Sequence, residues 1–547
     1  MNNDNNNQDN NKDGNEQYNL RKADSSSVDF ADKAYELTMP SSESEGSHMV
    51  TKKTIASGEP LKLAVVGHTN TGKTSILRTL LRDVYFGEVK NEAATTRHVE
   101  RAQLTDSQTG EVLVALYDTP GLEDASGLMD WLEDNTASRR DGIERLQQFL
   151  ASDIAHSDDR DDNHAVVSAS NNYSSQSYSQ NYDYSQEAKV IRQLLASDMA
   201  IYVVDAREPV LGKYRDELAI LSWAAIPVMP VFNFTDAQDA NIDEWQTMLA
   251  RRNLHISTRF DSVAFEFNDE MRLWQNLATM LTHSEMLEQL MARRTENWAQ
   301  LYDEATIVIA DFLLNVAAFV REISEDDDPM PVLQQMQEAV RQSERAMQHN
   351  LLNLYKFYDN AVAATPLDLQ AYQQDPFDPE LLKSYGIRTT SGAAAGALLG
   401  LGIDAAALGT TLGLGAAIGG IAGGLLSNTS SIADKISGVK RLYIDPATLT
   451  LLATRAIDLL TALRHRGHAA TDATQLIYNG ESSMADNNDD NGNAITPWAT
   501  HKLPSELKKA RGKPQWSSLS SGKSEQAQLL RADMAWSLAS KLSSYQS

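Results

Sequence analysis

The chain has 547 residues, enough for roughly two to four domains, and its 48 basic and 75 acidic side chains give a formal net charge of −27. A protein this acidic repels phosphate backbones, which argues against broad nucleic-acid binding. The sequence has no cysteine, which excludes disulfides and thiolate metal sites and suits a reducing cytosol.

Two segments have the composition of unfolded chain. The Asn- and Asp-rich segment 1–58 has neither the basic start nor the apolar core of a secretory signal peptide, and it buries too little apolar surface to offset the entropy of ordering. We expect it to be disordered. The stretch 157–186 is rich in Ser, Asn, Gln and Tyr. It indicates a low-complexity insert over 151–187, either a solvated loop or an adhesive tyrosine segment.

The stretch 61–81, LKLAVVGHTNTGKTSILRTLL, joins an apolar run to an amphipathic run through a glycine loop. The loop matches G-x-x-x-x-G-K-[ST] in the strand–loop–helix context that the pattern requires. Its glycines let backbone N–H groups point inward, and a helix N-terminus adds positive charge. We expect Lys73 at the β- and γ-phosphates and the Thr74 hydroxyl on Mg²⁺. The predicted nucleotide-binding residues here are Gly67, His68, Thr69, Asn70, Thr71, Gly72, Lys73, Thr74 and Ser75.

A second motif follows the apolar run 112–118, which ends in Asp118, Thr119, Pro120 and Gly121. The Asp118 carboxylate is expected to hold the Mg²⁺ shell, and the Gly121 N–H to contact a γ-phosphate. Between the two motifs, Thr96, or less plausibly Thr95, is positioned to reach the metal when a third phosphate is bound. The candidate catalytic residues are Lys73 and Thr96, and the candidate metal ligands are Thr74, Thr96 and Asp118.

In this order and spacing the motifs resemble the GTPases of the TrmE–Era–EngA–septin group, whose switch I and switch II carry TTR and DTPG. The resemblance implies GTP rather than ATP. That group selects guanine with Asn-Lys-x-Asp, and here Asn233, Phe234 and Asp236 stand at the first, second and fourth positions. It implies that Asp236 accepts from guanine N1 and N2 while Asn233 braces the loop. Phe234 replaces the lysine and offers a ring to the base.

The fold class follows from the alternation of apolar and helical stretches. We expect an α/β P-loop NTPase G domain over 59–270, with a mostly parallel six-stranded sheet and the nucleotide at its carboxyl edge. The expected strands are 61–67, 98–104, 112–118, 199–205, 226–232 and 262–267. The last strand carries Ser262 and Ala264, the nearest match to the Ser-Ala-Lys motif of the group. Asp205 ends another strand, where we expect it simply to close a turn.

The sequence lacks the glutamine that usually orients the attacking water in small GTPases. Leu122 follows the switch II glycine and can neither donate nor accept a hydrogen bond, so we expect slow hydrolysis that recruits another group, a partner or an ion. Asn70 matches the residue with which TrmE-like members bind K⁺, which predicts K⁺ stimulation. The alternative role of Asn70 is to brace the loop.

The second half predicts an all-α C-terminal domain, with helical segments over 271–390 and 428–475. Between them, 391–427 is a Gly/Ala/Leu stretch whose only charge is Asp404. Glycines four apart favour close helix packing in lipid, and the basic flanks favour a hairpin with both ends cytoplasmic. The alternative is a helical pair packed against the soluble domain. The remainder, 476–547, is expected to be a linker, a basic tail and a short C-terminal helix.

The basic tail concentrates positive charge in an acidic chain, through Lys502, Lys508, Lys509, Arg511 and Lys513. It suits lipid head groups, RNA or an acidic intramolecular partner, and a solvated tail is the default. The overall plan is similar to a bacterial GTPase family with a helical C-terminal domain of unknown function.

Together these features predict a GTP-binding protein that slowly hydrolyses GTP to GDP and phosphate. We expect it to act as a nucleotide switch at the inner face of the cytoplasmic membrane, with Mg²⁺ and K⁺ as its cations. Its expected partners are GTP or GDP, lipid, and a second copy joined through the glycine-rich helices or the G domains; nucleic acid is not expected. The alternatives are a non-hydrolysing nucleotide-dependent scaffold and a ribosome- or RNA-associated factor like several Era relatives.

Overall fold

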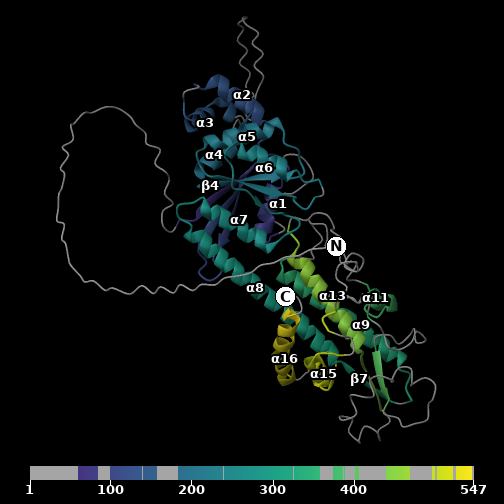
Figure 1. Cartoon of the computed structure of the whole chain (residues 1–547). Helices are drawn as coiled ribbons and strands as arrows, with labels where there is room; N and C mark the ends of the chain where they lie inside the picture. Colours follow the sequence, from purple (N-terminus) through teal and green to yellow (C-terminus); the bar gives the residue numbers. More distant parts are fainter. Residues whose placement is uncertain are drawn as a thin grey trace, which may run out of the picture. The chain divides into compact units, whose positions relative to one another are not determined.

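The computed structural model describes residues 59–83, 99–137, 140–156, 183–237, 239–324, 326–357, 374–385, 387, 401–405, 439–468, 496–498, 502–520 and 525–544 (Figure 1). Thr95 and Thr96 lie outside the described residues, as do the tail 1–58 and most of the tyrosine-rich insert.

A six-stranded sheet forms the first part of the described chain, in the order β2–β3–β1–β4–β5–β6. Its strands are β1 (Leu61–Val66), β2 (Glu100–Thr105), β3 (Val112–Asp118), β4 (Met199–Asp205), β5 (Val228–Asn233) and β6 (Thr258–Arg259). β2 runs antiparallel to β3, and every other pair is parallel. The predicted mostly parallel sheet is confirmed, and its parallel strands bring the loops with the sequence motifs to one edge.

Helices cover both faces of this sheet (Figure 1). Side chains alternate along β1: Leu63 and Val65 join one hydrophobic cluster, and Ala64 and Val66 join the other. The first cluster includes residues of α1 (Lys73–Leu81) and α7 (Phe267–Thr279). The second includes residues of α2 (Ala125–Asn135), α3 (Gly142–Leu150), the short η1 (Asp153–Ala155), α4 (Ser185–Ala196), α5 (Gly212–Trp223) and α6 (Ile242–Ala250). The sheet is therefore buried on both sides, as its apolar strands require.

The last strand differs from its predicted place. We expected a strand over 262–267, whereas β6 is the two-residue Thr258–Arg259, and α7 already begins at Phe267. Oδ1 of Asp261 accepts hydrogen bonds from the N–H groups of Val263 (2.8 Å) and Ala264 (3.0 Å). This Asx-type turn diverts the chain before a strand can form.

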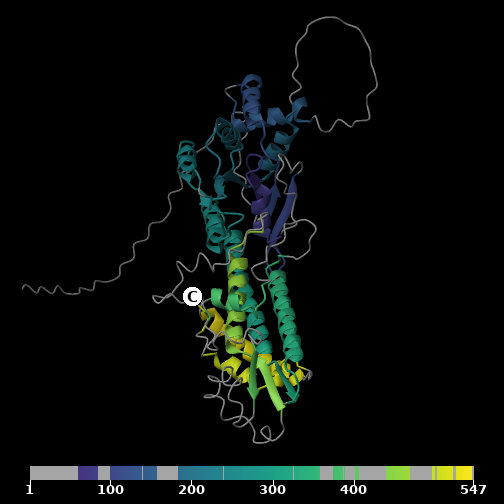
Figure 2. The same cartoon turned by 90° about the vertical axis from the view of Figure 1, so that its right-hand side faces the viewer.

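The second part of the described chain is mainly helical, as predicted. The long α8 (Glu285–Ala317) contacts α7 and four helices of this second part: α9 (Met330–Leu354), α13 (Pro446–Arg464), α15 (Ser505–Arg511) and α16 (Glu525–Ser544). Figure 2 shows α9 and α13 running side by side. The shorter α11 (Pro379–Ser384) packs on α13, and η4 (Pro514–Trp516) packs on α15 and α16.

A three-stranded antiparallel sheet, in the order β7–β9–β8, interrupts these helices. It contains β7 (Val320–Ser324), β8 (Leu401–Ala405) and β9 (Val439–Ile444). β8 lies inside the segment that we expected to form a helical hairpin, so its five residues are extended rather than helical, because they pair with β9. The rest of 391–427 lies outside the described residues.

Among the described helices, α13 is the one whose length and mean hydropathy of 1.2 would allow it to cross a membrane. It is capped by Asp445, whose carboxylate accepts from the N–H groups of Ala447 and Thr448. In the structure 72% of the apolar 18-residue stretch of α13 is buried, as in a helix of a protein core.

Candidate nucleotide-binding site

The loop between β1 and α1 curls through backbone conformations that side chains disfavour. Gly67 has φ +146° and Gly72 has φ +87°, and a Cβ on Gly67 would lie 2.7 Å from the Val203 carbonyl oxygen. Gly72 is the N-cap of α1, and no side-chain hydrogen bond caps this helix. The N-terminus of this helix, with the partial positive charge of its N–H groups, therefore faces the loop, where an anion would be favoured.

The Lys73 ammonium sits inside this loop. Its Nζ donates to the carbonyl oxygens of Gly67 (3.1 Å) and His68 (2.8 Å). Burial lowers its pKa, and the nearby carboxylates of Asp118, Glu217 and Glu123 oppose that shift. Backbone carbonyls therefore hold the Lys73 ammonium at the centre of the loop, where an anionic ligand could bind it.

Thr74 and Asp118 meet at the carboxyl edge of the sheet. The Thr74 hydroxyl donates to Oδ2 of Asp118, and Oδ1 of Asp118 is buried with no hydrogen-bond partner among the residues that the structure describes. Burial raises the pKa of Asp118 to about 6, against the opposing effects of Thr74 and Lys73. A hydroxyl beside an unsatisfied buried carboxylate oxygen is a donor set that suits a hard cation such as Mg²⁺. Ser75 is buried in the same first turn.

The chain after β3 packs directly on the phosphate loop. The Thr119 hydroxyl donates to the Val65 carbonyl oxygen (2.8 Å) and ties β3 to β1, and Pro120 is buried beside it. A Cβ on Gly121 would lie 2.2 Å from Oγ1 of Thr69, so no side chain fits there. The predicted switch II glycine therefore lies against the loop that holds Lys73.

Leu122 points away from this site. Its side chain is fully buried in the hydrophobic cluster that includes Leu128 and Leu218, and its N–H donates to the Gly67 carbonyl oxygen (3.3 Å). The residue in the position of the usual glutamine is therefore part of the core. The next side chain, Glu123, accepts from the Thr69 hydroxyl at 3.3 Å.

The end of β5 is bonded to the phosphate loop. Nδ2 of Asn233 donates to the Thr71 carbonyl oxygen (3.1 Å), while its Oδ1 accepts from the N–H groups of Phe234 (3.0 Å) and Ser262 (2.9 Å). Asp236 has an exposed side chain, and its N–H donates to Oδ2 of Asp261 (3.3 Å). Ala264, by contrast, pairs with Arg466 in an isolated bridge.

Phe234 carries a guanidinium over its ring. The Arg207 Cζ lies 3.9 Å from the ring centroid, and the guanidinium donates to both oxygens of Asp205 (2.9 and 2.7 Å). Asp205 closes a turn, as expected, by accepting from the Arg207 N–H, but it also orients the Arg207 side chain. A Cβ on Gly72 would lie 3.0 Å from the Phe234 ring, so the ring borders the phosphate loop. The Arg207 guanidinium, paired with Asp205, thus stands beside the position where the GTPases that the motifs resemble carry lysine.

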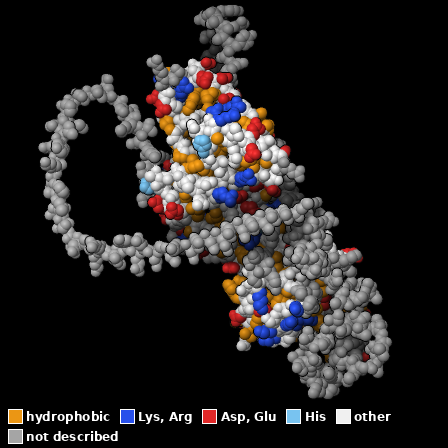
Figure 3. All heavy atoms as spheres, viewed as in Figure 1, with side chains coloured by type: hydrophobic (Ala, Val, Ile, Leu, Met, Phe, Trp, Pro, Cys, Tyr) orange, Lys and Arg blue, Asp and Glu red, His pale blue; other side chains and the backbone are white. Residues whose placement is uncertain are grey.

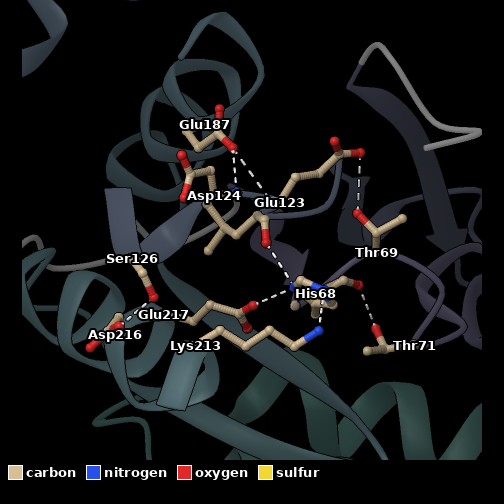
Figure 4. A network of polar contacts seen from close by, with 12 residues as sticks. His68, Thr69, Thr71, Glu123, Asp124, Ser126, Glu187, Lys213, Asp216 and Glu217 are labelled. Carbon is tan, nitrogen blue, oxygen red and sulfur yellow. Dashed lines mark hydrogen bonds and ion pairs between the residues drawn. The ribbon is translucent and has the colours of Figure 1, made fainter. Parts of the chain in front are cut away.

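Sequence reasoning missed the network around His68, which Figure 4 shows. Nδ1 of His68 lies 2.7 Å from Oε1 of Glu217 and 2.9 Å from the Leu122 carbonyl oxygen, and Nε2 lies 2.7 Å from Nζ of Lys213. Two acceptors face Nδ1 and an ammonium faces Nε2. A neutral imidazole with its proton on Nδ1 satisfies all three contacts. Tyr202 donates to the other Glu217 oxygen (2.7 Å).

Two further acidic residues hold the start of switch II (Figure 4). Oε1 of Glu187 accepts from the N–H groups of Glu123 and Asp124 (both 3.2 Å), and Ser126 donates to Asp216 (2.6 Å). The segment after Gly121 is therefore bonded to α4 and α5 as well as to the phosphate loop. The one signal in the sequence that could have pointed to this arrangement is a histidine next to the first loop glycine.

Two family models match the chain. Residues 62–234 match the model described as 50S ribosome-binding GTPase, and residues 246–539 match the model described as a domain of unknown function, DUF3482. The first match makes the six-stranded part a P-loop G domain. A search of curated proteins found no match.

Parts of the chain are similar to solved structures at low identity. Era in complex with MgGDPNP and 16S ribosomal RNA is 15% identical at a TM-score of 0.26, over 41% of this chain and 57% of that one. Aquifex aeolicus Era bound to GDP·AlF4⁻ is 14% identical at a TM-score of 0.26, over 53% and 89%. The G domain of the T. maritima FeoB iron transporter is 16% identical at a TM-score of 0.20, over 41% and 99%. The chain thus spans little more than half of the first of these structures.

Proposed function

The chain belongs to the family defined by the domain of unknown function DUF3482, and because a G domain precedes that domain, we propose that it is a GTP-binding switch that slowly hydrolyses GTP to GDP and phosphate. The observation that carries this proposal is the arrangement of Lys73, Thr74 and Asp118 at one loop. Lys73 is held by carbonyls inside the loop, and Asp118 keeps a buried oxygen unsatisfied beside the Thr74 hydroxyl.

Each group has a defined task with a bound triphosphate. The N-terminus of α1 and the Lys73 ammonium bind the β- and γ-phosphates, and Gly121 presents its N–H beside them. Thr74 and Asp118 would hold Mg²⁺, which neutralises phosphate charge when bound, with Thr96 as the proposed third ligand. Asn233 keeps the end of β5 against the loop, and Asp236 accepts from guanine.

Turnover is proposed to be slow because Leu122 is buried in the core and offers no group to orient water. Asn70, exposed in the loop with φ +65°, is the proposed K⁺ ligand. Comparing GTP turnover in KCl and in NaCl tests this role, and equal rates would remove it. If no phosphate is released over hours while GTP binds, the non-hydrolysing scaffold is the better description.

Calorimetry with GTP, GDP and ATP in the presence of Mg²⁺ tests the binding step. We expect guanine nucleotides to bind and Lys73→Ala to lose most of the affinity. Lys62→Ala is the matched control, because Lys62 lies near the amino end of β1, at the opposite end of the strand from the loop. Equal binding by Lys73→Ala and wild type would overturn the proposal.

Membrane association at the inner face of the cytoplasmic membrane is the second part of the proposal. The described strands support it: Ala405 at the end of β8 pairs with Lys440 of β9, so the chain leaves and returns at adjacent positions of one sheet. An apolar segment joined this way would enter and leave lipid on the same side. The test is to compare how the full chain and a chain lacking 406–427 float with liposomes. Equal flotation would mean that another segment binds the lipid. Light scattering of the same two chains tests self-association.

The description of the matching G-domain model favours one other candidate, a ribosome-associated factor. The Era structure with 16S ribosomal RNA points the same way for that protein, in tension with our expectation that nucleic acid is not a partner. The net charge of −27 opposes it. Co-sedimentation with ribosomes in GTP and in GDP decides between the two.

A further inference from the structure

The C-terminal helix α16 exposes an unusual amount of apolar surface. Five large hydrophobic side chains are exposed in the part of the chain that the structure describes, and three of them lie on this one helix. Leu529 is 70% exposed, Leu530 47% and Trp536 63%. Because Leu529 and Trp536 are seven residues apart, they lie on the same face of the helix.

The opposite face of α16 is already used. Leu538 and Leu542 are buried, and the helix packs on α8. The Arg531 guanidinium donates to both oxygens of Asp311 on α8 (2.7 and 3.0 Å), which fixes the rotation of α16 about its axis. The outer side carries Leu529 and Trp536 together with the exposed Asp533, so it is a mixed face with an apolar patch. Only the inner side of α16 is covered within the described chain.

Lysines border this exposed face. Nζ of Lys541 on α16 lies 2.8 Å from Oε2 of Glu506 on α15, which joins the two helices. Figure 3 shows Lys and Arg side chains gathered over α15 and α16, with hydrophobic side chains beside them. The exposed cations of this surface, besides Lys541, are Lys502, Lys508, Lys509 and Lys513.

Acidic residues do not cancel this charge. Residues 502–544 contain eight basic and three acidic side chains in a protein whose net charge is −27. Glu506 is nearly buried and paired with Lys541, so Asp533 and Glu525 are the exposed acids of the two helices. The surface is therefore locally positive in an otherwise strongly acidic chain.

We propose that α15 and α16 form a docking surface for anionic phospholipid, in which Leu529, Leu530 and Trp536 enter the head-group layer. Lysines attract the anionic surface, and a tryptophan is favoured at the boundary between head groups and acyl chains. The exposed leucines and tryptophan beside the lysines favour a lipid surface over a soluble acidic peptide, which the lysines alone would attract. The proposal deepens the membrane association proposed above and rests on it, but it does not depend on nucleotide binding.

Co-sedimentation of the full chain with vesicles of phosphatidylcholine, with and without phosphatidylserine, is the test. We expect wild type to prefer the anionic vesicles and to lose binding as salt is raised. The double variant Lys508→Gln, Lys509→Gln should partition about twenty-five-fold more weakly, since each lysine near an anionic surface contributes roughly a factor of five. The double variant Leu529→Ala, Trp536→Ala should lose about ten-fold. All four side chains are exposed, so both variants should keep their fold.

Matched controls come from the G domain. Leu211→Ala with Ile256→Ala removes two apolar side chains of 42% and 41% exposure, and Arg251→Gln with Arg252→Gln removes an exposed basic pair. Neither should change vesicle binding.

The outcomes separate this inference from the proposed function. If wild type ignores anionic vesicles, both the surface and the membrane association fail, while GTP binding is untouched. If the α15 variant and the α16 variant both bind vesicles as wild type does, another part of the chain binds the lipid and the proposed docking surface is wrong. If wild type instead forms a dimer that Trp536→Ala abolishes, or binds polyglutamate or RNA but not vesicles, the occupant is a second copy, an acidic protein or nucleic acid, and the lipid proposal is overturned.

Discussion

Nδ1 of His68 lies 2.7 Å from Oε1 of Glu217, a side chain with no exposed surface, and this pair joins the phosphate loop to α5. The same imidazole reaches the Leu122 carbonyl oxygen, so this side chain joins the phosphate loop to the segment after Gly121 as well. Any movement of the segment after Gly121 must therefore break or shift this part-buried contact.

Removing this imidazole should destabilise the G domain. In His68→Ala the buried Glu217 carboxylate keeps Tyr202 as a donor but loses the histidine, which costs about 2 kcal/mol in the free energy of unfolding. A double-mutant cycle with Glu217→Gln in urea should give a coupling of about 1 kcal/mol or more. His255→Ala, at an exposed position, is the control. Additive effects of the two substitutions would show that the pair is not coupled.

Gly72 should tolerate no side chain. Its φ is +87°, and a Cβ would lie 2.2 Å from Nδ2 of Asn233, which bonds to the Thr71 carbonyl oxygen. Gly72→Ala should weaken GTP affinity at least about ten-fold, because backbone strain and displacement of Asn233 act together. Titration with a fluorescent GTP analogue measures this loss.

Gly212 provides the matched control for that substitution. It begins α5, and a Cβ at this position would have no neighbouring atom within 4 Å, so Gly212→Ala should bind GTP without loss of affinity. Equal effects at Gly72 and Gly212 would contradict the close packing of Gly72 on Asn233.

Binding of the magnesium–nucleotide complex should weaken in mild acid. Burial raises the pKa of Asp118 from 3.8 to about 6, so the carboxylate takes up a proton below that pH and can no longer face a cation. Affinity should be constant above about pH 7 and fall up to ten-fold per pH unit below about 6. Asp118→Asn should bind weakly with no such dependence, and a wild-type profile as flat as that of the variant would contradict the assignment.

The stability of the free protein should respond to the same group with the opposite sign. Because the folded pKa is raised, this carboxyl contributes most stability below about pH 3.8 and loses that contribution as the pH rises through about 6. Thermal melts of wild type and Asp118→Asn should therefore diverge between these two pH values, with the variant gaining relative to wild type as pH rises. Melting temperatures that differ by a constant amount across this range would show that the folded pKa of Asp118 is not raised.

Arg207 should oppose a return to the common guanine motif. In Phe234→Lys the new ammonium would replace a ring that now lies 3.9 Å from the Arg207 guanidinium, so two like charges would meet. We expect this variant to bind GTP no better than wild type, and the double variant with Arg207→Ala to show a higher ratio of GTP to ATP affinity. Competition titrations measure the ratio. An improved ratio in Phe234→Lys alone would mean that Arg207 does not act on this position.

By itself the sequence determined the local chemistry and the order of elements. Glycine spacing, Lys73 and the flanking apolar runs define a phosphate loop because backbone conformation and helix dipoles act over a few neighbouring residues. The same holds for the alternation of strands and helices, which follows from periodic burial. Even there, the turn at Asp261 displaced the last strand through side-chain-to-backbone bonds that periodicity does not report.

Only the tertiary structure decided which distant residues meet. Glu217 lies 149 positions after His68, and Arg207 reaches Phe234 from a neighbouring strand end, contacts that no spacing rule predicts. Packing also placed the Leu122 side chain in the core, and it gave the basic tail a folded place, with α15 against α8 and α16. Such contacts join residues that are far apart in the sequence. They depend on how all the helices and strands pack together, so no local pattern predicts them.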